Sequence, residues 1–153
     1  MSGTEQAIGT RPGWMGLLAR APAEELACLW GEAGLEAPAH DWLRRPETGA
    51  VMVRGRAGAQ GAPFNLGEMT VTRCALRLAD GREGHAHVQG RDKAHARRAA
   101  LADALLQGAE AATVRDRILA PLAEAEAARR AARARRAAAT RVEFFTMARG
   151  EDG

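Results

Sequence analysis

The dipeptide Asp80-Gly81 is the local feature that most constrains the fold of this chain. It lies between two segments with the alternating, β-branched character of strands, residues 68–78 and 83–89. A two-residue turn between antiparallel strands needs positive φ at both central positions, and Asp-Gly adopts this conformation readily. We therefore expect these segments to form a hairpin that turns at Asp80-Gly81, which requires an antiparallel sheet.

A third strand and a glycine-rich loop are predicted ahead of this hairpin. Residues 50–56 alternate in character, with Val51 and Val53 on one side of the expected strand. Segment 58–68 contains several glycines, but it fits neither the Walker nor the dinucleotide fingerprint, because both need a following helix where this chain has a strand. We expect it to be a rigid protein-docking loop with Phe64 as its anchor.

Helical patterns flank the β-type region. A short helix is expected from residue 12, and a second follows Pro22, which suits the first position of a helix. A third begins at Asp92, whose side chain can accept a hydrogen bond from the open amides of the first turn. A fourth covers residues 113–139, and Pro121 must kink or interrupt it. The expected fold class is α+β: a small antiparallel sheet of about three strands, N-terminal and C-terminal helices, and an extended C-terminal tail.

The length of the chain gives room for one ordinary domain. We expect a flexible N-terminus at residues 1–11, a single α+β domain at 12–139 and a partner-docking tail at 140–153. Large apolar side chains are scarce: there are 36 alanines, while Leu, Ile, Val and Phe together make 25 of 153 residues. Chains below roughly 20% of these four types build a core with difficulty. Because the net charge is only +3, the composition predicts a folded domain that another subunit completes.

The C-terminal tail indicates a partner most directly. An Ala/Arg-rich helical stretch runs into the apolar peptide 142–147, which holds two of the three phenylalanines in the chain. Adjacent aromatic side chains without a core to enter mark a surface that meets another protein. The predicted partner interface consists of Phe64, Arg141, Val142, Phe144, Phe145 and Met147.

Positive charge is concentrated in one segment. Residues 128–142 hold six arginines and no acidic residue. Such a helix could bind nucleic acid, a phosphorylated ligand or an acidic protein face, and it could equally be solvated. No aromatic residue interleaves these arginines and no nucleic-acid-binding motif accompanies them, so the solvated or protein-facing interpretation is favoured and no nucleic-acid partner is predicted.

The expected hairpin would bring a cysteine and two histidines together. With a two-residue loop, Cys74 lies opposite His87, and the same register places His85 on that face of the sheet. Sulfur and imidazole would suit zinc. However, Leu76 shares the face and no fourth ligand is evident, so no metal site is predicted. Cys74 and Cys28 are expected to be free thiols, because their positions show no pairing pattern.

A candidate anion site lies at the start of the third helix. The exposed backbone amides there, together with Arg91, Lys93, His95 and Arg98, could hold a phosphate, because the helix dipole and the cations both favour an anion. The alternative is that Asp92 already caps these amides while the cations face solvent or an acidic partner.

No set of catalytic residues is readable. The chain has no Gly-x-Ser-x-Gly motif and no tyrosine, and its carboxylates show no recognisable spacing. There is no charged-then-apolar signal pattern, and no apolar run approaches the roughly 20 residues that span a bilayer. We expect a cytoplasmic assembly subunit with no membrane partner, more than a complete enzyme.

Four segments resemble a known family. They are RPETGAVMVRGR at residues 45–56, PFNLGEMTVTRC at 63–74, GRDKAHARRAALADAL at 90–105 and AAATRVEFFTMARGE at 137–151. With them, nearly the whole chain is similar to the G subunit of the bacterial phosphonate carbon–phosphorus lyase system. The last two segments are the most specific, because neither is a generic structural pattern.

The resemblance implies an assembly and a reaction. Members of this family join the H, I and J subunits, chiefly I, in the step in which methylphosphonate or another alkylphosphonate displaces adenine from ATP. The product is α-D-ribose 1-methylphosphonate 5-triphosphate. The resemblance further implies that subunit I is the catalyst, that ATP is a substrate of the complex, and that this chain itself carries no cofactor and no catalytic residue. Within the complex it could be a structural companion only, or it could supply the cations of residues 91–98 to a shared active site.

Overall fold

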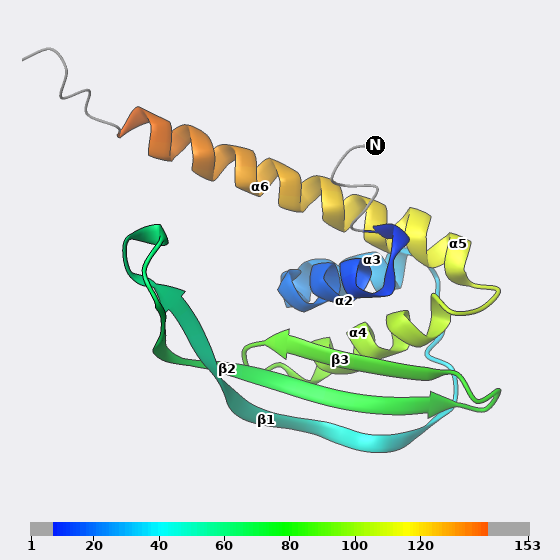
Figure 1. The fold of residues 1–153 in the computed structure, drawn as a ribbon. Coiled ribbons are helices and arrows are strands. Elements are labelled where there is room, and N and C mark those ends of the chain that lie inside the picture. The colour runs from blue at the N-terminus through cyan, green and yellow to red at the C-terminus, as the bar shows by residue number, and fades with distance from the viewer. Residues whose placement is uncertain (1–7, 141–153) are drawn as a thin grey trace, which may run out of the picture.

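The structure, a computed structural model, describes residues 8–140. Three antiparallel strands form one sheet in the order β1-β2-β3, and helices cover one of its faces (Figure 1). The predicted α+β class is therefore confirmed. The elements are α2 (Arg11–Arg20), α3 (Ala23–Glu32), β1 (His40–Arg56), β2 (Pro63–Leu78), β3 (Glu83–Gln89), α4 (Lys93–Leu105), α5 (Ala111–Val114) and α6 (Ala120–Ala139).

The helices lie over the sheet in an inner and an outer tier. In the inner tier, α4 packs on β2 and β3, and α2 packs beside it on β3. Helix α3 contacts α4, and the segment that joins α5 to α6 contacts both α2 and α3. Figure 1 shows that α6 is the outermost helix and that it extends beyond the sheet-covered part of the molecule.

The hairpin between β2 and β3 forms, but the predicted two-residue loop is wrong. The loop has three residues, and the amide of Gly81 donates to the carbonyl of Leu78 at 3.0 Å. Gly81 has a φ of 91°, so one left-handed glycine closes a turn that ends in a bulge. The pairing is shifted by one residue as a result, and Cys74 lies opposite Ala86 instead of His87.

Strand β1 begins at His40 and passes through Pro46, well before the predicted start at residue 50. The register with β2 shifts between Arg44 and Glu47, so the proline lies at an irregularity of the ladder. Proline lacks the amide that a ladder needs, and it is tolerated on edge strands and at bulges. Because β1 is an edge strand, the sheet can include Pro46.

Beyond the end of β3, strands β1 and β2 continue as a two-stranded ribbon that we call the arm, residues 51–69. The arm turns through a short 3-10 helix at Ala57–Ala59. Figure 1 shows that it bends toward the side of the sheet on which α6 lies. The predicted docking loop at 58–68 is therefore mostly strand, and Phe64 lies in β2 opposite Gly55.

The predicted helices form, and the cap at the start of α4 is confirmed, because the side chain of Asp92 accepts a hydrogen bond from the first turn. Pro22 is the N-cap of α3 and not its first helical residue, and α5 begins at Ala111 instead of residue 113. Helix α2 begins at Arg11, one residue before the predicted start, and so includes the last residue of the predicted flexible N-terminus. Its guanidinium donates to the carboxylate of Asp103 at 2.7 Å, so Arg11 belongs to the folded domain.

Pro121 interrupts the last helical segment, as predicted. Helix α5 ends at Val114, a π-helical turn covers Arg115–Leu119, and α6 starts at Ala120. The amide of Ala120 donates to a carbonyl five residues back, that of Arg115. The wider turn gives the proline ring the room that a regular α-helical turn would not.

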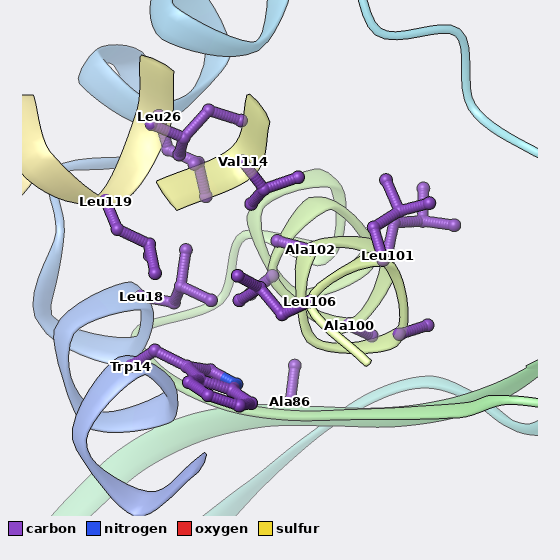
Figure 2. Packing of buried hydrophobic residues seen from close by; sticks show 14 of the residues in the cluster. Trp14, Leu18, Leu26, Ala86, Ala100, Leu101, Ala102, Leu106, Val114 and Leu119 are labelled. Carbon is purple, nitrogen blue, oxygen red and sulfur yellow. The ribbon is translucent and has the colours of Figure 1, made fainter. Parts of the chain in front are cut away.

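The core is built from leucines and many small side chains. Figure 2 shows Trp14 and Leu18 of α2 packed with residues of α4 and with Ala86 of β3. Gly84 in β3 is buried, and a Cβ at this position would collide with the backbone carbonyl of Ala100 in α4. The glycine and the alanines of α4 therefore allow the helix to lie very close to the sheet, which compensates in part for the shortage of large apolar residues.

The predicted docking tail lies outside the described residues. This concerns Arg141, Val142, Phe144, Phe145 and Met147. Within residues 8–140, no helix is both long and apolar enough to cross a membrane.

Candidate functional site

The four predicted ligand-binding residues lie on α4 or immediately before it. Arg91 and Lys93 are exposed, and Arg98 is half-buried. The carboxylate of Asp92 accepts a hydrogen bond from the amide of His95 at 2.9 Å. The chain therefore caps the start of this helix with its own acid, in agreement with the alternative interpretation of the motif.

The imidazole of His95 has a structural environment. The residue is only 3% exposed, and its Nε2 lies 2.8 Å from the carbonyl oxygen of Leu18. This contact joins α4 to the last turns of α2 and satisfies a buried polar group. Because the ring faces the core, the structure does not bring His95 together with the other three predicted residues.

Arg98 borders a hollow between α3 and α4. The hollow has a volume of about 260 Å³. Its lining residues are Trp30, Ala37, Ala94, Arg97, Arg98 and Leu101. Spacings of three and four residues put the α4 members on one face of the helix, which the sequence could have shown. That Trp30 of α3 completes the wall could not be read from the sequence, because it depends on how the two helices pack.

The proposed cluster of one cysteine and two histidines does not form. The shifted register places Ala86 instead of His87 opposite Cys74, whose Sγ lies in the core 3.2 Å from the carbonyl oxygen of Ala96. His85 and His87 are exposed on the opposite face of the sheet. Among residues 8–140, no group of three or more His, Cys, Asp or Glu side chains is placed to hold a metal ion. Burial raises the pKa of the Cys74 thiol to about 11.

Asp103 is a fully buried carboxylate that the sequence predictions missed. It accepts hydrogen bonds from the Arg11 guanidinium at 2.7 and 3.1 Å, from Nε1 of Trp14 at 2.9 Å and from the amide of His85 at 2.9 Å. The carboxylate thereby joins α2, α4 and the outer edge of β3. The available signal was a single acid within an otherwise apolar stretch of α4, since buried acids are rare unless paired.

Exposed large apolar side chains gather on the arm. Met52, Phe64 and Leu66 are 55%, 46% and 66% exposed. In the described part of the chain, Leu43 is the other large apolar residue with comparable exposure. An apolar group of this kind on a protruding ribbon is typical of a contact surface.

The outer part of α6 is basic and uncovered. Midway along the helix, Arg129 forms an ion pair with Glu25 of α3 at 2.8 Å. Further out, Arg133, Arg135 and Arg136 are exposed and form no ion pair within residues 8–140. The helix is therefore attached to the domain at its first half and offers its second half to solvent or to a partner.

Comparison with known proteins agrees with the family expected from the four sequence segments. Residues 9–150 match the family described as "Phosphonate metabolism protein PhnG". A relative from Rhizobium meliloti (strain 1021), "Alpha-D-ribose 1-methylphosphonate 5-triphosphate synthase subunit PhnG", is 47% identical over 149 residues, which cover 95% of this chain and 92% of the relative. The chain belongs to the PhnG family of phosphonate metabolism proteins.

Proposed function

We propose that this chain is a subunit of an enzyme complex that synthesises α-D-ribose 1-methylphosphonate 5-triphosphate. The observation that carries this proposal is the similarity, along nearly the full length of both chains, to a relative named as a subunit of that synthase. In the proposed reaction an alkylphosphonate displaces adenine from ATP, and the phosphonate becomes attached to the ribose.

The proposed role of this chain is assembly, with the reacting groups on a partner. We assign the partners as the H, I and J subunits of a carbon–phosphorus lyase complex, and chiefly subunit I. Two buried polar groups of this chain support an architectural role, because Asp103 and His95 are both engaged by hydrogen bonds that hold its own elements together.

The arm is the proposed docking surface within the described residues. Phe64 and Leu66 protrude from a ribbon of only two strands, and such ribbons are at best marginally stable in water without further cover. A partner that covered these side chains would bury apolar area and also stabilise the ribbon. Residues 141–147 remain the second part of the proposed interface.

Co-expression with the H, I and J subunits tests the proposal. A tagged wild-type chain should retain the other subunits through purification, and the purified complex should release adenine from ATP when methylphosphonate is added. A chain that retains none of these subunits would remove the proposed function.

The docking surface needs its own variants. The double variant Phe64→Ala plus Leu66→Ala should lower the yield of complex at least tenfold, because truncating a well-packed interface residue costs about 2 kcal/mol or more. Leu43→Ala is the matched control, since Leu43 is 45% exposed but lies outside the arm. Equal yields from the two variants would exclude the arm as the docking surface.

The tail is tested in the same assay. Phe144→Ala plus Phe145→Ala should also reduce the yield of complex. An undiminished yield would count against a docking role for residues 141–147 while leaving membership of the complex intact.

A further inference from the structure

The hollow between α3 and α4 combines an aromatic wall with two guanidinium groups. Trp30 of α3 lies on one side, and Arg97 and Arg98 of α4 lie on the other, with Ala94 and Leu101 completing the α4 side. Ligand sites are concave, largely apolar and equipped with a few polar groups, with volumes from about 300 Å³ upward. At about 260 Å³ the hollow suits a small ligand or one part of a larger one.

The positive charge beside the hollow is not neutralised within the described fold. Of the 19 arginines among residues 8–140, eight form ion pairs with carboxylates and eleven do not. Arg97 and Arg98 belong to the second group, and what sets them apart is that both line the hollow. Lys93 lies one helical turn before Arg97, and like charges at this spacing destabilise a helix. An anion bound at the hollow would relieve this repulsion.

We propose that this hollow binds the triphosphate chain of a nucleotide-type ligand. Guanidinium groups present paired N–H donors that match the oxygens of phosphate groups, and they remain charged at any working pH. The indole of Trp30 offers a flat apolar surface for the organic part of such a ligand. The choice of a triphosphate among phosphorylated ligands rests on the proposed function.

The site lies on the side of α4 and not at its N-terminus. The carboxylate of Asp92 occupies the amide of His95 at the helix start and would repel a second anion there. The anion site is thereby moved from the predicted group around Arg91 and His95 to Arg97 and Arg98. Lys93 remains close enough along the helix to add to the positive field.

Binding of inorganic tripolyphosphate to the full-length chain tests the inference. Titration calorimetry in about 0.15 M salt, where charges beyond about 8 Å are screened, reports the local site. The double variant Arg97→Gln plus Arg98→Gln should weaken binding by about tenfold or more for each arginine removed. Arg133→Gln plus Arg135→Gln removes the same charge from the outer part of α6, and it should change the affinity by less than about twofold.

Further ligands identify what the site accepts. ATP and the ribose triphosphate product should compete with tripolyphosphate, and adenosine, which lacks the phosphates, should compete at least about tenfold more weakly than ATP. Unchanged affinity in the Arg97/Arg98 variant, an equal loss in the α6 control, or adenosine competing as strongly as ATP would each overturn the proposal. A thermal unfolding scan checks folding, and Arg97→Gln alone, at an exposed position, should still give about a tenfold loss.

The two proposals fail separately. If the chain assembles into a complex that releases adenine but does not bind tripolyphosphate through Arg97 and Arg98, only the present inference is wrong. If the chain binds tripolyphosphate through these arginines but retains no partner subunit, the anion site stands and the proposed function is wrong.

Discussion

Strand β2 passes through two different environments. In its second half Cys74 and Leu76 are buried under α4, whereas in its first half Phe64 and Leu66 are 46% and 66% exposed. The second half, which we call the inner half, pairs with both β1 and β3 and has helices above it. The first half lies in the arm and pairs only with β1. The domain therefore stabilises the inner half with its own elements and leaves the arm available for another chain.

The largest effect is expected from removing Asp103, the buried carboxylate of α4 that ties the helices to the sheet beside the inner half of β2. Asp103→Ala removes the acceptor for Arg11, for Nε1 of Trp14 and for the amide of His85. Arg11 is 42% exposed and can turn to water, but Nε1 of Trp14 and the amide of His85 lose their acceptor at about 1–3 kcal/mol each, which urea denaturation measures as a loss in the free energy of unfolding. Glu47→Ala removes an exposed carboxylate that is paired with Arg73, and it should cost at most about 1 kcal/mol. Equal losses in the two variants would show that the hydrogen bonds of Asp103 to α2 and β3 contribute no more to stability than an exposed ion pair.

Leucine-to-alanine substitutions at one position in each half of β2 compare the two halves directly. Leu76→Ala opens a cavity at a fully buried position, so the free energy of unfolding should fall by about 2–5 kcal/mol. Leu66→Ala removes a side chain that is 66% exposed, and it should change the free energy of unfolding by no more than about 0.5 kcal/mol. Similar costs for the two leucines would mean that the arm is packed within the isolated chain, against the contrast drawn here.

Cys74, in the inner half of β2, should also make the free energy of unfolding depend on pH in the alkaline range. Burial raises the pKa of the Cys74 thiol from 9.0 to about 11, so the native state retains a proton that the unfolded chain releases. The contribution of this thiol to the free energy of unfolding is complete below pH 9 and declines as the pH rises from about 9 to 11. Cys74→Ala should have a shallower decline over this range than the wild type in denaturation curves at fixed pH. Parallel declines would assign the pH dependence to other groups.

The smallest changes in the free energy of unfolding are expected for α6, whose first half is attached to the domain and whose second half is exposed. Arg129 pairs with Glu25 midway along the helix, so Arg129→Ala should lower the free energy of unfolding by up to about 1 kcal/mol. Arg133 lies in the exposed outer part, so the free energy of unfolding should be nearly the same in Arg133→Ala as in the wild type. A larger loss for Arg133→Ala would indicate that the outer part of α6 packs on the domain.

Features that depend on neighbouring residues in the chain were predictable from the sequence. The cap at Asp92, the helix after Pro22 and the interruption at Pro121 each follow from the chemistry of one side chain acting within a single turn. The hairpin at Gly81 was also predictable, but its register was not, because loops of two and three residues can share the same Asp-Gly sequence. That single residue decides whether His85 and His87 lie on the same face of the sheet as Cys74 or on the opposite one.

Features that depend on distant residues were not predictable. The bonds from Arg11 to Asp103 join positions 92 residues apart, and no local pattern relates them. The early start of β1 likewise depends on β2, since the residues around Pro46 have no strand pattern of their own. For the candidate anion site, the sequence indicated the cations of α4, but the packing of α3 decides that Arg98 borders a hollow and that His95 does not.

The π-helical turn before Pro121 determines how α6 is rotated about its own axis relative to the domain. Each residue of an α-helix advances about 100° around the axis, and a π turn absorbs one extra residue. Without that extra residue in the turn Arg115–Leu119, the whole of α6 would be rotated by about this angle relative to the domain. Arg129 would then face away from Glu25, and the outer arginines would point in a different direction. One proline at the root of a projecting helix thus determines the side on which an incoming subunit would meet its charge.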